Sequence, residues 1–279
     1  MKKIVCELPT DLLDLFVVSL NGYGIEILNR DEKITTFAIY AENNEEETLK
    51  ETIYSIFEEL GNGKIILEEE IKEENWEEKW KENFKPIKIP PFVIIPEWEV
   101  YEKKDLIPIK IKVAQAFGTG LHATTQLVLS LLPEFIKNGF SVLDIGTGTG
   151  ILAIASAKLG ASEIYAIDIH DKAVEECKIN SWENEVKVKC EQKSVEEVKG
   201  SYDVVLANLQ IEIFRKYFNK IKPLFKKYLI VSGIFKEKEK EELLKIAENL
   251  NLKLIQEEKK PESPEKPEDL WYAFVFQHS

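Results

Sequence analysis

The sequence has 279 residues, 44% of them hydrophobic, and a net charge of −13. This length and composition predict one large or two ordinary globular domains and exclude a wholly disordered chain. The negative charge disfavours a general nucleic-acid binder, which needs a basic surface, and favours a basic partner or simple solubility. No apolar run reaches the roughly 20 residues of a membrane span, and the N-terminus lacks a signal-peptide pattern. We therefore expect a soluble cytoplasmic protein without a membrane partner.

The three cysteines, Cys6, Cys177 and Cys190, form no Cys-x-x-Cys pair. An odd number of isolated cysteines suits a reducing compartment, where such residues act as small apolar side chains. We expect all three to behave in this way, and we predict no metal site in the chain.

The first 70 residues alternate short strand and helix patterns. Extended patterns at 2–8, 24–29, 33–42 and 64–71 enclose helical patterns at 9–22 and 44–63. The order βαββαβ is that of a ferredoxin-like α+β domain. Because this stretch carries no catalytic group of residues, we expect residues 1–70 to form a substrate-recognition domain.

A charged segment with regularly spaced aromatic residues follows. Trp76, Trp80 and Phe84 recur every four residues, which places them on one face of a helix, and Pro86 ends that helix. We expect residues 71–90 to be a connecting helix or linker whose aromatic stripe packs on a neighbouring surface.

Residues 91–279 predict a second, larger domain. Two apolar extended segments, 92–98 and 107–115, come first, and two strands around a proline- and glutamate-rich loop occupy 252–277. Between them, strand and helix patterns alternate, which predicts an α/β fold with a doubly wound parallel sheet and helices on both faces. The strands are expected at 141–145, 163–168, 186–191, 202–207 and 228–233, and the helices at 123–137, 150–160, 171–182, 211–221 and 236–250.

A glycine-rich turn follows the first of these strands, in "VLDIGTGTGIL", residues 142–152. Gly146, Gly148 and Gly150 would let a ligand approach the backbone closely, beside the start of a helix. The turn lacks the Gly-Lys-Ser/Thr ending of a nucleotide-triphosphate loop. The dinucleotide-binding pattern is Gly-x-Gly-x-x-Gly/Ala. A pattern that starts at Gly146 fails, because its last position is Ile151, whereas one that starts at Gly148 matches, because its last position is Ala153. A dehydrogenase therefore remains an alternative.

Two acidic residues favour a ligand without phosphate. Asp144 precedes the glycines, where a carboxylate would repel a pyrophosphate and attract an ammonium group. Asp168 ends the next strand 22 residues after Gly146, the usual place for an acid that binds a ribose diol. S-Adenosylmethionine has both an adenosine ribose and an amino-acid moiety. The alternative for Asp144 is that it only braces the turn. The alternative for Asp168 is that it is a helix-entry acid before Asp171.

Three segments carry a family resemblance. "VLDIGTGTG" resembles the first signature of the class I methyltransferases, which have a Rossmann-like sheet and use S-adenosylmethionine. "AFGTGLHATTQLVL" (116–129) and "DVVLANLQ" (203–210) resemble more specific motifs of the bacterial methyltransferases of ribosomal protein eleven of the large subunit, the PrmA family. With "WEEKWKENFKPIKI" and the small leading domain, the resemblance covers nearly the whole chain.

The resemblance implies the site residues. Thr125 would bind the cofactor, with Gly146 against it and Asp168 on its ribose hydroxyls, and Asn208 would face both the cofactor and the incoming amine. The chain departs from the family in having "KVAQ" for Asp-Pro-Gly and Leu121-His122-Ala123 for Thr-His-Pro, which leaves the shape of the upstream loop open. His122 is interpreted as a turn residue, with a role as a base as the alternative.

The resemblance also implies the reaction, transfer of methyl groups to lysine side chains and an N-terminal amine of that basic ribosomal protein. The alternatives are another basic protein target, a nucleic-acid amine, or an assembly factor that binds the cofactor without turnover. Asn208 is followed by Leu-Gln-Ile where nucleic-acid amine methyltransferases have Pro-Pro and an aromatic residue for stacking on the base. No cysteine follows a proline, so a cytosine-C5 nucleophile is absent from the sequence. We expect a monomer without direct nucleic-acid specificity.

Overall fold

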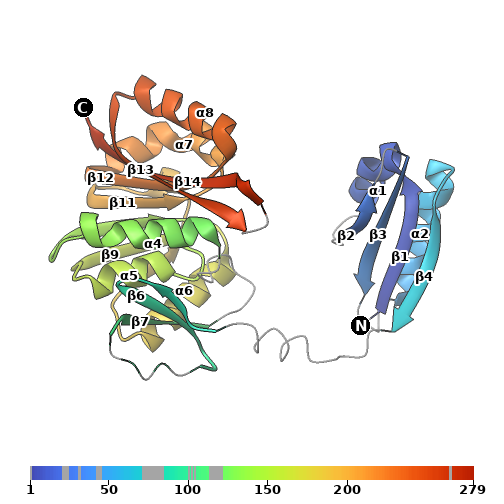
Figure 1. Ribbon diagram of the computed structural model, residues 1–279, viewed down its shortest axis with the longest axis horizontal. Coiled ribbons are helices and arrows are strands. Elements are labelled where there is room, and N and C mark those ends of the chain that lie inside the picture. Colours follow the sequence, from blue (N-terminus) through green and yellow to red (C-terminus); the bar gives the residue numbers. More distant parts are fainter. Residues whose placement is uncertain are drawn as a thin grey trace. The chain divides into compact units, whose positions relative to one another are not determined.

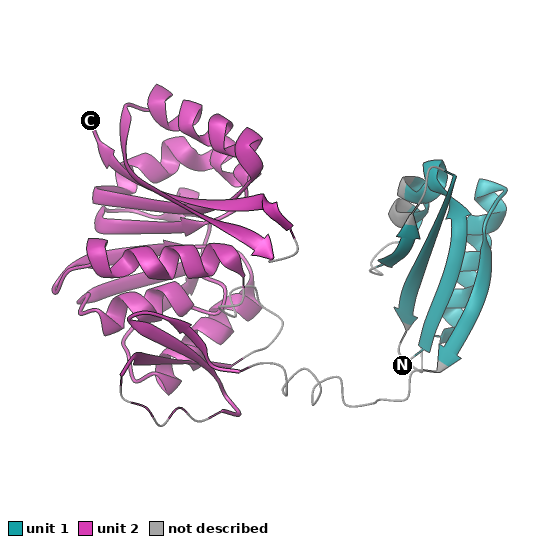
Figure 2. Ribbon diagram, viewed as in Figure 1, with its two compact units in different colours: residues 1–82 teal, residues 83–279 magenta. Residues whose placement is uncertain are grey.

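A computed structural model of the chain describes residues 2–20, 25–30, 33–41, 46–70, 85–99, 101, 103, 105–112, 122–263 and 266–279. The chain divides into two compact units, residues 1–82 and 83–279 (Figure 2). The predicted aromatic stripe of Trp76, Trp80 and Phe84 lies outside the described residues. Within the described residues, no helix is both long and apolar enough to cross a membrane.

The first unit is a four-stranded antiparallel sheet with two helices on one face. The strand order β2-β3-β1-β4 places the first strand in the centre, as the βαββαβ pattern requires (Figure 1). Phe16 of the first helix packs against Phe37 of the sheet and against Phe57 of the second helix in a separate hydrophobic core. The elements are β1 (Lys2–Pro9), α1 (Leu13–Ser19), β2 (Ile25–Arg30), β3 (Ile34–Ala41), α2 (Glu46–Leu60) and β4 (Lys64–Glu70).

The second unit is built around a seven-stranded sheet of order β10-β9-β8-β11-β12-β14-β13 (Figure 1). The first five strands in this order are parallel, and β14 and β13 add an antiparallel edge. The strands are β8 (Ser141–Ile145), β9 (Glu163–Asp168), β10 (Lys189–Gln192), β11 (Tyr202–Asn208), β12 (Phe225–Phe235), β13 (Leu252–Ser263) and β14 (Lys266–His278). The helices are α4 (Ala123–Phe135), α5 (Ile151–Lys158), α6 (Asp171–Glu183), α7 (Ile211–Ile221) and α8 (Lys236–Asn249).

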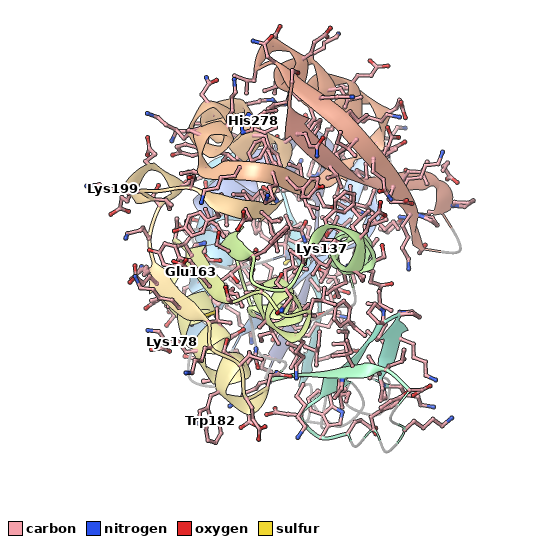
Figure 3. The ribbon with its side chains drawn as sticks, turned by 90° about the vertical axis from the view of Figure 1, so that its left-hand side faces the viewer. Lys137, Glu163, Lys178, Trp182, Lys199 and His278 are labelled. Atoms are coloured by element: carbon pink, nitrogen blue, oxygen red, sulfur yellow. A yellow bond between two sulfur atoms is a disulfide. The ribbon has the colours of Figure 1, made fainter. Side chains whose placement is uncertain are left out.

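Both faces of this sheet are buried. Val142 of β8 packs into a core with α4, α5 and α6, whereas Leu143 and Ile145 pack on the opposite side with α7 and α8. The central strands are therefore apolar on both faces, as is usual for parallel strands covered by helices. The outer side of α6 faces solvent: Figure 3 shows Lys178 and Trp182 there, and Trp182 is 76% exposed.

A three-stranded sheet, β5 (Ile87–Ile89), β6 (Phe92–Pro96) and β7 (Ile107–Ile111), packs against the α4 and α5 side of the core. Two buried asparagines, Asn180 of α6 and Asn184 directly after this helix, hold the last strand of the sheet. The side-chain oxygen of Asn184 accepts the N–H of Lys110 at 2.9 Å, and that of Asn180 accepts the N–H of Lys112 at 2.8 Å. Residues 71–90 were expected to be a connecting helix or linker, but residues 87–89 of this range form strand β5 of the second unit.

The structure confirms the predicted α/β fold, and the predicted strands and helices of the large sheet are all present. Two differences have physical causes. The strand expected at 228–233 extends over Phe225–Phe235, because it pairs with β11 on one side and with β14 on the other. The strand expected at 186–191 begins only at Lys189, where pairing with Tyr165 of β9 starts.

The expectation that all cysteines act as isolated apolar side chains is wrong for two of them. Cys177 of α6 and Cys190 of β10 form a disulfide, because the edge strand lies directly beside the helix that precedes it. Their spacing of 13 residues carries no sequence signal for this bond. Cys6 remains free and buried, and burial raises the pKa of its thiol to about 12.

The disulfide should stabilise the second unit. Closing a loop of 13 residues in the unfolded chain corresponds to about 3 kcal/mol in the chain-entropy description. We expect dithiothreitol to lower the free energy of unfolding by about this amount in chemical denaturation. A Cys177→Ala/Cys190→Ala double variant is the control and should not respond to the reductant. A wild-type protein that is equally insensitive would contradict the stabilising role of the bond.

Candidate functional site

A large cavity lies at the carboxyl ends of the parallel strands. β8 has β9 on one side and β11 on the other, so the chain reverses direction across the sheet between β8 and β11, where α/β proteins bind ligands. The cavity has a volume of about 1020 Å³. The described residues that line it include the following from these strand ends: Ile145, Gly146, Gly148, Ile167, Asp168, Asn208, Leu209, Gly233 and Trp271.

The glycine turn is fixed by its own backbone hydrogen bonds. The N–H groups of Gly146 and Thr147 both donate to the carbonyl of Ile167 in β9, at 2.9 and 3.0 Å. The N–H of Gly150 donates to the carbonyl of Thr147 at 2.9 Å. Gly150 has φ 83°, and a Cβ there would lie 3.1 Å from the Cα of Cys177, so glycine allows the turn to pack on α6.

Asp144 lies beneath this turn and is buried. Its carboxylate accepts the hydroxyl of Thr147 at 2.6 Å and a backbone hydrogen bond from Ala153 in the first turn of α5. Removal from water raises the pKa of this carboxyl to about 7, although these hydrogen bonds favour its ionised form. Asp144 is not among the described residues that line the cavity. It therefore connects the turn to the start of the helix.

Asp168 lies on the cavity wall at the end of β9. One carboxylate oxygen accepts the N–H of Gly148 at 3.1 Å, and the other accepts the N–H of His170 at 3.0 Å. Each oxygen keeps lone-pair capacity for a further donor. The carboxylate is thus held rigidly against the glycine turn, with its remaining acceptor sites available to hydroxyl groups in the cavity.

These contacts bear on the kind of ligand that the turn accepts. A turn that binds a pyrophosphate directs free N–H groups at it, next to the positive end of a helix. Here the N–H groups of Gly146, Thr147, Gly148 and Gly150 already have acceptors in the protein, and the carboxylate of Asp144 occupies the start of α5. The arrangement favours a ligand that carries no phosphate in this turn.

Asn208 ends β11 on the other side of β8 and lines the same cavity. Its backbone pairs with Ser232 of β12, which fixes the point at which the chain leaves the sheet. The side chain is an uncharged amide, with one acceptor and two donors. The structure therefore brings Asn208, Gly146 and Asp168 to one cavity from three neighbouring strands.

The start of α4 and the first half of β14 form a further wall of the cavity. His122 is the N-terminal cap of α4, with its Nδ1 accepting the N–H of Thr124 at 3.3 Å, and burial lowers the pKa of its imidazole. Its ring packs edge-on against Trp271 at 4.7 Å. Thr125 is buried, and its Oγ1 makes no hydrogen bond with any described residue. Only Thr124 of the pair is among the described lining residues.

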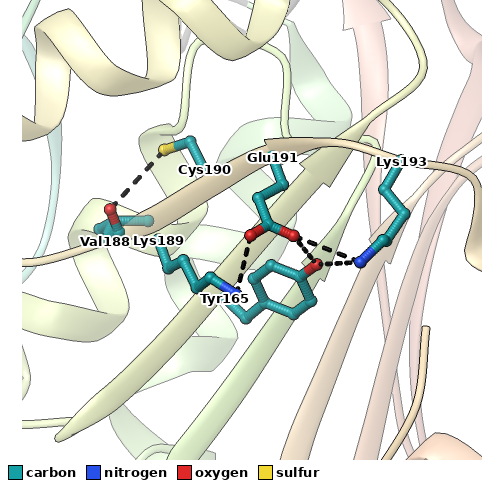
Figure 4. Close-up of polar contacts among 6 residues, drawn as sticks. All are labelled: Tyr165, Val188, Lys189, Cys190, Glu191 and Lys193. Atoms are coloured by element: carbon teal, nitrogen blue, oxygen red, sulfur yellow. Dashed lines mark hydrogen bonds and ion pairs between the residues drawn. The ribbon is translucent and has the colours of Figure 1, made fainter. Parts of the chain in front are cut away.

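Lys193 also lines the cavity, and the charge of a neighbouring glutamate compensates its positive charge. The Nζ of Lys193 lies 3.1 Å from the hydroxyl of Tyr165 and 3.3 Å from a carboxylate oxygen of Glu191, and Lys189 lies 2.8 Å from the other oxygen (Figure 4). The hydrogen bond from Lys189, with one from Tyr165, lowers the pKa of Glu191 to about 2. Glu191 therefore stays ionised beside both lysines and reduces the positive field at this wall.

The sequence pointed to the three strand ends of the site but not to its other walls. Gly148 lines the cavity and Gly150 supports the turn from outside the lining, whereas the upstream loop 113–121 lies outside the described residues. Trp271 and Gly233 were not predicted, because an aromatic residue or a glycine in an apolar strand gives no signal for a site. Only the antiparallel pairing of β14 with β12 brings Trp271 to this edge.

The raised pKa of Asp144 predicts a pH dependence of stability. The folded carboxyl binds its proton more tightly than the unfolded one, so stability falls as the pH rises from the unfolded pKa of about 3.9 to about 7, and then levels off. Between pH 5.5 and 8.5 we expect Asp144 to account for a loss of about 2 kcal/mol in the free energy of unfolding. Denaturant titrations of wild type and Asp144→Asn should show a smaller loss in the variant; equal losses would contradict the assignment.

Comparisons with known proteins agree with this geometry. The family model described as ribosomal protein L11 methyltransferase (PrmA) matches residues 19–262. A ribosomal protein L11 methyltransferase of Aquifex aeolicus is 41% identical over 275 residues, which cover 99% of this chain and 97% of that protein. One of Caldicellulosiruptor saccharolyticus is 39% identical over 211 residues, or 74% of this chain and 69% of that protein.

A solved structure supports the same relationship. The ribosomal protein L11 methylase of Lactobacillus delbrueckii subsp. bulgaricus superimposes with a TM-score of 0.63 at 26% identity, and the match covers 70% of this chain and 100% of that one. The second unit accordingly has the Rossmann-like fold of the class I methyltransferases. From its sequence and its structure, the chain belongs to the family of ribosomal protein L11 methyltransferases (PrmA).

Proposed function

We propose that the protein transfers methyl groups from S-adenosylmethionine to amino groups of ribosomal protein L11, namely lysine side chains and the N-terminal amine. Family membership makes the chain a methyltransferase, and its relatives are named for L11. One observation carries the assignment of the site: Asn208, Gly146 and Asp168 line a single cavity at the carboxyl edge of the sheet. A ribosomal substrate also implies that the enzyme works in the cytoplasm.

The cavity fits this cofactor. Asp168 offers acceptors for ribose hydroxyls, and Gly146 and Gly148 allow close approach of the ligand to the backbone. Asp144 and Gly150 support the turn from below, a role that the sequence left open for Asp144. The buried Oγ1 of Thr125 makes no hydrogen bond with a described residue, and we assign it to the methionine end of the cofactor. When bound, S-adenosylmethionine supplies a methyl group activated by a sulfonium.

Asn208 orients the incoming amine. A lysine with a pKa near 10.4 is neutral in only about 0.04% of molecules at pH 7, and forming the neutral amine costs about 4.6 kcal/mol. The side-chain oxygen of Asn208 accepts a hydrogen bond without the full charge with which a carboxylate would stabilise the ammonium form. Trp271 and Leu209 give the cavity an apolar wall, and a less polar surrounding further favours the neutral amine. Alignment and desolvation are the main contributions of the protein.

The first unit is proposed to bind the protein substrate. Residues 1–70 hold 16 acidic and six basic residues, a net charge of −10 out of −13 for the chain. The cavity-bearing remainder is nearly neutral by comparison. An acidic unit attracts a basic ribosomal protein over long range. This division supports residues 1–70 as the recognition domain.

Purified L11 tests the proposal directly. The enzyme, L11 and S-adenosylmethionine should give L11 species heavier by whole methyl groups in intact-mass spectra, and proteolysis should place them on lysine and the N-terminal amine. Parallel reactions contain an unrelated basic protein or ribosomal RNA. Methyl transfer to either of these, with L11 unchanged, would show that the proposed substrate is wrong.

Asp168→Ala should weaken cofactor binding. Loss of a charge-assisted hydrogen bond corresponds to about 1.5–3 kcal/mol, measured by isothermal titration calorimetry with S-adenosylhomocysteine. Asp203→Ala is a matched control, because that carboxylate accepts backbone and hydroxyl groups of Ser141 at the amino end of the same sheet. If both variants bind equally well, Asp168 does not hold the ribose.

Asn208→Ala should leave cofactor affinity nearly unchanged and lower kcat at least ~10-fold, because misalignment alone costs up to about 100-fold. Asn208→Asp keeps the shape but stabilises the ammonium form of lysine, so it should also be slow at pH 7. Radiolabelled methyl transfer measures kcat, and calorimetry measures binding. An alanine variant with wild-type turnover would remove the proposed role of Asn208.

Deletion of residues 1–70 should retain cofactor binding and abolish methylation of L11, since the two units have separate cores. In the full chain, KM for L11 should rise with added salt, because screening weakens attraction between exposed charges. Cofactor affinity reports the folding of the truncated protein. Full activity of the truncated protein, or a KM independent of salt, would refute recognition by the acidic unit.

A further inference from the structure

Leu209 occupies an unusual place between two glycines. It follows Asn208 at the end of β11 and lines the cavity next to it. Its side chain lies over Gly146 of the glycine turn, and its backbone lies on Gly233 of β12. Both glycines line the same cavity. Leu209 therefore contacts a glycine of the turn that we assign to the cofactor, and it is bonded directly to Asn208, the proposed amine-orienting residue.

The backbone contact depends on the glycine at 233. Its φ is 87°, and the pairing of β12 with β14 shifts register between Ser232 and Ile234. A Cβ on Gly233 would lie 2.3 Å from the carbonyl oxygen of Leu209 and 2.7 Å from its carbonyl carbon. The N–H of Leu209 donates to the carbonyl of Ser232 at 3.0 Å, so the peptide is held by a hydrogen bond as well as by contact.

The side-chain contact depends on the glycine at 146. A Cβ on Gly146 would lie 2.5 Å from Cδ2 of Leu209. The turn at this point is itself anchored, since Gly146 and Thr147 both donate to the carbonyl of Ile167. The leucine side chain thus rests on a fixed surface that belongs to the cofactor site.

We propose that Leu209 is a positioning residue: seated between Gly146 and Gly233, it sets the place of Asn208 relative to the glycine turn. The proposal rests on the proposed function, in which Asn208 orients the amine and the turn carries the cofactor. Because Leu209 is neither charged nor a hydrogen-bonding side chain, its effect passes through geometry. A displacement of about 1 Å at a reacting group can reduce a rate 100-fold, so small shifts of this residue are sufficient.

Variants of the full-length enzyme separate positioning from stability. Leu209→Ala removes the side chain above Gly146, and Leu209→Met nearly conserves its volume. Gly233→Ala displaces the Leu209 backbone. Gly139→Ala is the control, because Gly139 has a similar φ of 83° but nothing within 4 Å of a Cβ. Each variant is measured for kcat and KM with L11, for cofactor affinity by calorimetry, and for thermal unfolding.

We expect Leu209→Ala and Gly233→Ala to lower kcat at least ~10-fold with cofactor affinity within about threefold, as misplacement of the amine predicts. Leu209→Met should recover most of kcat, and Gly139→Ala should have the kcat of wild type. Should Gly233→Ala fail to fold, the Leu209→Ala and Leu209→Met pair decides. Wild-type kcat in Leu209→Ala, or an equal loss in both leucine variants, would overturn the positioning role. Failure of wild type to methylate L11 would instead reject the proposed function.

Discussion

The site depends on the attachment of the glycine turn to the neighbouring strand. The carbonyl of Ile167 in β9 receives the N–H groups of both Gly146 and Thr147, and the carboxylate of Asp168 receives that of Gly148. These bonds form only when β8 and β9 lie side by side in register, with Ile145 opposite Ile167. The turn is therefore rigid before any ligand arrives. The N–H groups of Gly146, Thr147 and Gly148 are engaged in this attachment, so they are not directed at a ligand.

Acidic residues determine the charge around this turn and the cavity. Asp144 lies at the start of α5, where a dinucleotide-binding protein would hold a pyrophosphate, and satisfies the helix and Thr147 instead. Burial raises the pKa of this carboxyl to about 7, and that energetic cost is the consequence of placing an acid under the turn. Glu191 forms ion pairs with Lys193, which lines the cavity, and with Lys189. These acids offset positive charge at the start of α5 and beside Lys193, which favours the proposed ligand without phosphate.

The charge of the chain is divided between its two units. Most of the net negative charge, −10 of −13, belongs to residues 1–70, whereas the proposed amine-orienting residue in the second unit is an uncharged amide. Negative charge attracts a basic protein but holds a lysine in its unreactive, protonated form. The proposed division of roles assigns long-range attraction to residues 1–70 and local reactivity to the second unit.

The sequence by itself determined the order of the elements, the α/β class, and the strand ends that carry Asp144, Gly146, Asp168 and Asn208. Apolar periodicity and glycine spacing are local properties, so they can be read along the chain. Only the tertiary structure showed the Cys177–Cys190 bond, the wall of Trp271, and the seat of Leu209 between two glycines. These features arise where segments far apart in sequence meet, at distances set by sheet pairing and packing, and no local pattern records such distances.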